Sequence, residues 1–196
     1  MSSSLSVYVH NADHLEDVER LGKNDPYTQI TLNYEDKASF QKTATKKNGG
    51  KNPEWNQNLV LDNYDQTKHQ NLYVEVFDEE KGVDEPIAFT SIPLRQVLDA
   101  PNHVYKGKFD LYNTDSKQKG TISLTISILQ PGQSAGSGAP TATEVKGYSQ
   151  IETAHQKRFK SAQNKERAAD GATLAALAAA GGIASSLLGG GAKKPE

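Results

Sequence analysis

The stretch GTISLTISILQ, residues 120–130, constrains the fold of this chain more than any other part of the sequence. Isoleucine or leucine occupies every second position from 122 to 128, and threonine or serine occupies the positions between. In a β-strand, a period of two places all the apolar side chains on one face and all the polar ones on the other. The sequence therefore predicts a sheet with one buried face and one face in water.

Shorter runs of the same character precede this strand. They are separated by the turn-forming runs NDP, NGGKNP, KGVDEP, DAPNH and DSKQKG, and no helical pattern competes with them. The expected strands cover residues 5–10, 27–32, 39–45, 55–61, 71–78, 87–94, 104–112 and 120–130. Several short strands in so short a chain predict an all-β fold, an eight-stranded antiparallel β-sandwich over residues 1–130.

The composition changes after Gln130. Residues 131–143 are rich in Gly, Ser, Ala, Pro and Thr, as in a flexible linker. Residues 144–170 are basic and carry apolar side chains at roughly helical spacing, whereas residues 171–196 form an Ala/Gly-rich tail. Three interpretations of this tail remain open: a membrane span, a small-residue packing helix suited to self-association or shallow insertion, and disorder.

Charge and cysteine content narrow the class of protein. Residues 1–130 carry 14 basic and 19 acidic side chains, and residues 131–196 carry 8 and 5, so an acidic front part precedes a basic tail. This distribution argues against a nucleic-acid-binding protein built on a basic face. The chain has no cysteine, which excludes disulfides and Cys-ligated metals. The N-terminus has no basic and apolar secretory pattern, so we expect a cytoplasmic protein.

Two acidic segments are candidates to converge at one end of the sandwich. EDVERLGKND covers residues 16–25, and DEEKGVDE covers residues 78–85. Carboxylates that are held close together resist joint ionisation unless they are solvated or share a cation. Ca²⁺ takes six to eight oxygen ligands in flexible geometry, whereas Zn²⁺ needs His or Cys, and the five His residues are scattered.

Three separated motifs carry a resemblance to a known family. GKNDPYTQI, KTATKKNGGKNPEWNQNLVL and LYVEVFDEEKGVDEPIAFTSIPL resemble, in this order, the motifs of C2 domains. The resemblance covers about residues 3–130 and departs from the family pattern at Ala88, where a glycine is usual. The order of the strands is similar to the C2 permutation in which the extra strand lies at the C-terminal end.

The resemblance implies a set of calcium ligands. Asp25 matches the Asp of the first turn, and Asp78 matches the first Asp of the third loop. The other positions read as Glu80, as Glu85 with Asp84 beside it, and as Glu19 with Asp17 nearby. Three of the five positions thus hold Glu, whose extra methylene displaces its oxygens. A weak or degenerate Ca²⁺ site and a solvated acidic rim around structural turns therefore remain as alternatives.

The resemblance also implies contacts with an anionic membrane surface. Val83 and Leu21 lie in the acidic loops and would be the apolar tips that enter the lipid interface, unless they pack back onto their own loops. Lys42, Lys46 and Lys47 would form a basic surface for lipid head groups, with Lys42 and Lys46 on one face of a strand. The alternative is an edge strand that lysines protect from aggregation.

Two hypotheses of function follow from these residues. The first is a non-enzymatic module that docks peripherally on anionic membranes and depends on Ca²⁺ if the site is intact. The second is an adaptor or structural protein whose sandwich binds other proteins and whose tail self-associates. The sequence offers an enzyme no nucleophile motif, no phosphate-binding loop and no His in the acidic loops.

Overall fold

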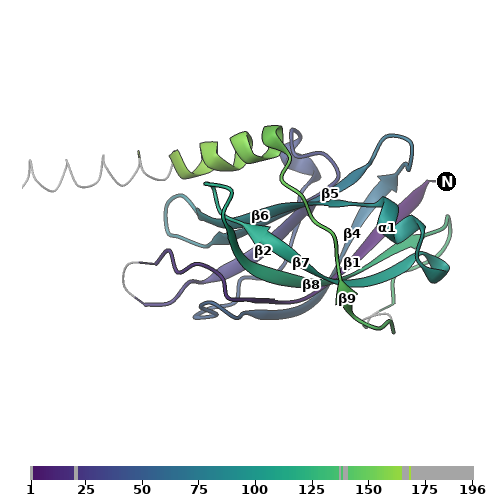
Figure 1. Ribbon diagram of the computed structural model, residues 1–196, viewed down its shortest axis with the longest axis horizontal. Coiled ribbons are helices and arrows are strands. Elements are labelled where there is room, and N and C mark those ends of the chain that lie inside the picture. The colour runs from purple at the N-terminus through teal and green to yellow at the C-terminus, as the bar shows by residue number, and fades with distance from the viewer. Residues whose placement is uncertain (1, 20–21, 137, 139–140, 165–167, 169–196) are drawn as a thin grey trace, which may run out of the picture.

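The computed structural model describes residues 2–19, 22–136, 138, 141–164 and 168. In this part of the chain, strands form a flattened sandwich, and a helix at residues 153–164 lies along it (Figure 1). The elements are β1 (Ser3–Asp13), β2 (Pro26–Thr31), η1 (Lys37–Ser39), β3 (Gln41–Lys42), β4 (Glu54–Tyr64), β5 (Asn71–Asp78), β6 (Glu85–Pro93), α1 (Arg95–Leu98), η2 (Pro101–His103), β7 (Val104–Tyr112), β8 (Gln118–Leu129) and β9 (Val145–Lys146).

The strands confirm the predicted antiparallel sandwich. They follow one another in the order β3-β2-β5-β6-β7-β8-β1-β4, and each neighbouring pair is antiparallel. The short β9 pairs with β7 in parallel. The alternating apolar positions of β8 and β1 fill the core, where Leu5, Val7, Leu124 and Ile126 are fully buried. The period-two pattern therefore predicted the strand and its core face. The prediction that the other face lies in water was wrong for β8, because Ser123, Thr125 and Ser127 are buried as well.

The strand expected at residues 39–45 is the main departure from the prediction. Only Gln41 and Lys42 form a strand, because the Thr43 hydroxyl accepts the Thr28 N–H at 3.0 Å, where a strand would offer a carbonyl. Lys46 therefore lies outside any strand, and the alternation that was expected to place Lys42 and Lys46 on one strand face does not apply.

Residues 145–164, which we call the strap, lie against the sandwich. The strap begins with β9 on β7, crosses to β6 through Ser91 and Gln150, and ends in the helix of residues 153–164. His155 and Phe159 on this helix are fully buried. The chain thus returns to the sandwich beyond Gln130, where the sequence analysis placed the end of the domain.

Residues 171–196, for which three interpretations were open, lie outside the described residues. Within the described part of the chain, no helix has the length and apolar character needed to cross a bilayer.

Candidate functional site

Several loops meet at the end of the sandwich where β1 and β5 finish. The Asp78 carboxylate accepts the Asp25 N–H at 2.5 Å, and the Glu79 N–H donates to the Asp25 carbonyl at 3.1 Å. The Gly50 N–H donates to the Asn24 carbonyl at 2.9 Å, which ties in the loop that follows β3. The two acidic segments of the sequence therefore converge. We call this end of the molecule the acidic end.

Asn24 positions the first acidic loop. Its side-chain oxygen accepts the N–H groups of Val18 and Glu19 at 3.1 and 3.2 Å, and its amide donates to the Glu16 carbonyl at 2.8 Å. Asn24 is fully buried, so these bonds replace the water that the loop backbone would otherwise bind. In the sequence, Asn24 is recognisable only as part of a turn, although Asn is a residue that often bonds to nearby backbone.

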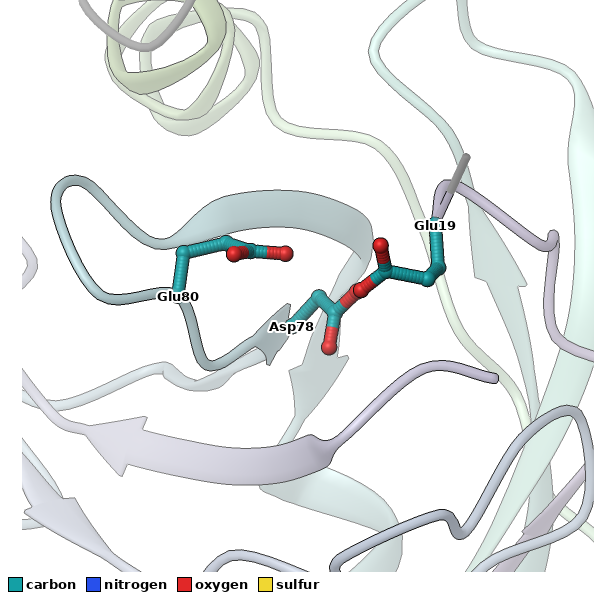
Figure 2. Close-up of side chains that lie close together, drawn as sticks. All are labelled: Glu19, Asp78 and Glu80. Atoms are coloured by element: carbon teal, nitrogen blue, oxygen red, sulfur yellow. The ribbon is translucent and has the colours of Figure 1, made fainter. Parts of the chain in front are cut away.

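Three carboxylates form a close group at the acidic end. Oxygen atoms of Glu19, Asp78 and Glu80, one from each, lie within 4.8 Å of one another, and Figure 2 shows their side chains directed toward a common space. Asp78 is fully buried, and among the described residues its Oδ2 has no hydrogen-bond partner. A buried carboxylate oxygen without a donor is costly, and a cation would satisfy it.

Burial and neighbouring charges both raise pKa values in this group, and burial is the larger cause. Burial raises the pKa of Asp78 to about 6; the charges of Glu19, Asp25 and Asp17 add to the rise, and the Asp25 N–H opposes it. Burial and the neighbouring Glu19 also raise the pKa of Glu80. Carboxylate oxygens that lie close together, with raised pKa values, are suitable ligands for a hard divalent cation such as Ca²⁺.

Asp25 and Asp84, two other predicted ligands, hold the loops in shape. The Asp25 carboxylate accepts the Asn48 N–H at 2.6 Å and the Lys47 ammonium at 3.1 Å, and the Asn48 bond is the main cause of its lowered pKa. Asp84 accepts the Tyr27 hydroxyl at 2.8 Å and the Glu80 N–H at 3.1 Å. Neither residue belongs to the three-carboxylate group.

The last two predicted ligands lie near the group. Glu85 opens β6, and its Cα is the ladder partner of Asp78 on β5. Asp17 is exposed, and its charge contributes to the raised pKa of Asp78. The two segments converge as the sequence predicts, and the structure separates the carboxylates that cluster, Glu19, Asp78 and Glu80, from Asp25 and Asp84, which bond to the loops.

The predicted lipid-contact residues are spread over the same end. Lys47 bridges Asp25 and Glu79, at 3.1 and 2.7 Å, while Lys42 lies over the Tyr27 ring at 5.1 Å from its centre. Lys46 is exposed in the loop that follows β3. Val83 at the tip of the β5–β6 loop is 40% exposed. Leu21 lies outside the described residues.

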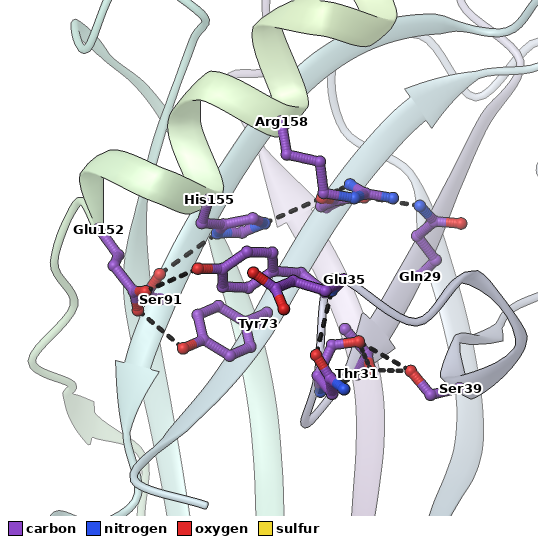
Figure 3. Close-up of polar contacts among 12 residues, drawn as sticks. Gln29, Thr31, Glu35, Ser39, Tyr73, Ser91, Glu152, His155 and Arg158 are labelled. Atoms are coloured by element: carbon purple, nitrogen blue, oxygen red, sulfur yellow. Dashed lines mark hydrogen bonds and ion pairs between the residues drawn. The ribbon is translucent and has the colours of Figure 1, made fainter.

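A second polar group lies beneath the strap (Figure 3). Ser91 contacts His155 Nδ1 at 3.2 Å, and His155 Nε2 contacts Glu75 at 2.9 Å. The connectivity is that of a Ser-His-acid relay, but all three residues are fully buried and offer a substrate no access. We therefore assign this group to the attachment of the strap.

The chain belongs to the C2 domain family, because the sequence profile of that family matches residues 3–111. The fold agrees: a C2 domain of a plant extended synaptotagmin 1 superposes with a TM-score of 0.55 at 24% identity, covering 67% of this chain and 97% of that one.

Two curated relatives come from Arabidopsis thaliana. A protein named "Protein SRC2 homolog" is 29% identical over 147 residues, 70% of this chain and 45% of its own length. A protein named "Calcium-dependent lipid-binding protein" is 29% identical over 127 residues, 62% of this chain and 24% of its own length. The chain thus spans less than half the length of either relative.

Proposed function

We propose that this chain is a membrane-docking module that binds anionic phospholipids through its acidic end and does so more strongly with Ca²⁺. The observation that carries the proposal is the unpartnered Oδ2 of Asp78, buried within a group of three carboxylates. The name of one Arabidopsis relative, a calcium-dependent lipid-binding protein, supports the same function.

Glu19, Asp78 and Glu80 are the residues that would hold the cation. Bound Ca²⁺ supplies positive charge for a lipid phosphate at an end of the protein that is otherwise acidic. Asn24 keeps Glu19 in place through the loop backbone, and Asp84 does the same for Glu80. These two bonds hold the loops that carry Glu19 and Glu80 and leave the carboxylates of Glu19 and Glu80 unused.

Two further groups of side chains would add to membrane affinity. Val83 is exposed at the tip of the loop that carries Glu80, where it can enter the interface between head groups and acyl chains. Lys42 and Lys46 are exposed on the same end, and each lysine near an anionic surface contributes about 1 kcal/mol.

Vesicle co-sedimentation with and without Ca²⁺ tests this function. The native chain should sediment with phosphatidylserine-containing vesicles when Ca²⁺ is added and much less with neutral vesicles. The double variant Asp78→Asn, Glu80→Gln should lose the Ca²⁺-dependent part, while Asp62→Asn, at an exposed site on β4, should behave as native. Binding that is equal for neutral and anionic vesicles, and unchanged by Ca²⁺, would refute the proposal.

A further inference from the structure

The strap closes a gap between two strands of the sandwich. In the part of the chain that the structure describes, β6 and β7 are paired at a single position, Phe89 with Tyr112. Beyond this position β9 pairs with β7, and Gln150 exchanges both backbone hydrogen bonds with Ser91 on β6, at 3.0 and 2.9 Å. The strap thus supplies hydrogen bonds that these two edges would otherwise lack.

Close packing at Gly147 makes this docking specific. A Cβ atom on Gly147 would lie 2.2 Å from a carbon of the Phe109 ring, so only glycine lets the strap backbone rest on that ring. The backbone N–H of Gly147 also donates to the Lys108 carbonyl on β7 at 2.9 Å. Phe109 is fully buried in the presence of the strap.

The helix of the strap supplies an aromatic anchor. Phe159 is fully buried, with its ring 5.3 Å from Phe77 and 5.0 Å from Phe89 between ring centres. Phe77 and Phe89 belong to a cluster separate from the main core, on the sheet face that the helix covers. The strap therefore covers an apolar cluster on this face, and we call the covered face the groove.

The buried carboxylate of Glu75 makes the groove complementary in charge to this helix. Glu75 is fully buried on β5, where it bonds to His155 and pairs with Arg158, both from the strap (Figure 3). Burial alone would raise the pKa of Glu75, but the His155 bond and the Arg158 charge outweigh it and lower the pKa. A carboxylate at this depth requires partners, so the groove favours a helix that brings a cation beside an aromatic residue.

Three glycines lie in the connector between the sandwich and the strap. None of Gly132, Gly136 and Gly138 has a described atom within 4 Å of the position that a Cβ would take. At these three positions the connector does not pack on the sandwich, whereas the strap contacts β5, β6 and β7.

We propose that this groove also takes the strap of a second copy of the chain, so that two molecules exchange residues 145–164 and form a dimer. Each contact described above joins the strap to the sandwich, so a neighbour's strap makes the same contacts and exchange costs little. The connector, residues 131–144, holds its own strap at an effective concentration on the order of 1 mM, so exchange competes as the protein approaches that concentration. Docking on a membrane would gather copies in this way.

Disulfide trapping tests the exchange, because the chain has no cysteine of its own. Lys108 and Lys146 are ladder partners on β7 and β9, at the spacing that a disulfide bridges. One full-length chain carries Lys108→Cys and another carries Lys146→Cys. Mixed under mild oxidation, they should form a mixed disulfide whose yield rises toward about 1 mM protein. The matched control is Lys157→Cys, an exposed position on the strap helix.

Two further measurements make the outcome decisive. Adding Phe159→Ala to the Lys146→Cys chain should reduce the mixed disulfide several-fold, since that strap has lost its anchor. Sedimentation velocity of the native chain should show dimers near 1 mM. A mixed disulfide no more abundant than that of the Lys157→Cys control would overturn the exchange, and so would a native chain that stays monomeric at this concentration.

Discussion

Asp78→Asn should stabilise the protein in the absence of metal, although it removes the central carboxylate of the site. Folding raises the pKa of Asp78 from 3.8 to about 6, so at neutral pH the folded state holds a charge that it disfavours. The rise corresponds to about 3 kcal/mol of unfolding free energy. Water at the rim of the site screens part of this, and we expect a gain of about 1–3 kcal/mol at pH 7.5.

The pH dependence follows from the same shift. Because the folded pKa is raised, the native protein is most stable when Asp78 is protonated, and it loses stability as pH rises from about 4 to 6. The native chain should therefore be about 1 kcal/mol more stable at pH 5 than at pH 7.5 from this group alone, and Asp78→Asn should lack this difference.

Urea unfolding at both pH values, followed by the fluorescence of Trp55, measures these changes. Trp55 is the sole tryptophan, and its indole N–H donates to the Pro26 carbonyl beside the acidic end. With Ca²⁺ at 100 times its dissociation constant the native chain should gain about 2.7 kcal/mol, and Asp78→Asn much less. If Asp78→Asn is less stable than the native chain at pH 7.5 without metal, the buried charge of Asp78 does not destabilise the folded state and the reasoning is refuted.

Three further changes probe the strap, all read by thermal unfolding of the full chain. Phe159→Ala should cost about 3–5 kcal/mol, because the ring is fully buried, whereas Lys157→Ala on the exposed side should change stability by less than about 0.5 kcal/mol. Gly147→Ala should cost about 1–3 kcal/mol from overpacking on Phe109, and Gly136→Ala, in open space, almost nothing; equal effects would contradict the docking geometry. Glu75→Gln should cost about 3–5 kcal/mol by leaving Arg158 without its counter-charge, and no loss would show that the pair is dispensable.

The sandwich could be predicted from the sequence because the patterns that specify its strands and turns are short and contiguous. The alternation in residues 120–130 and the turn runs between strands are each visible in a short window. The acidic end could be located for the same reason, since both acidic segments flank predicted strands. The separate roles of its carboxylates could not be predicted from the sequence. The bonds of Asp25 to Asn48 and of Asp84 to Tyr27 join segments that are distant in sequence.

The docking of the strap on the sandwich could not be predicted, because the residues that make the contact lie in two distant segments of the sequence. The strand at residues 71–78 has Leu72, Val74 and Val76 on one face, and the other face carries Tyr73, Glu75 and Phe77. Two aromatic residues around an acid on the face expected to meet water indicate that something covers it. His155 and Phe159 lie four residues apart and therefore share one face of a helix, which matches the covered face of residues 71–78. The two segments are far apart in the sequence, so no short window contains both.

The gap between β6 and β7, which the strap closes, has a consequence for folding during synthesis. Ser91 is synthesised 59 residues before Gln150, which bonds to both of its backbone groups. At about 5–20 residues per second, the ribosome needs several seconds to make the intervening chain. During that interval the nascent sandwich exposes two strand edges and an uncovered Glu75. The synthesis of residues 145–164 thus sets the time at which the sandwich is protected from its neighbours on the same messenger RNA.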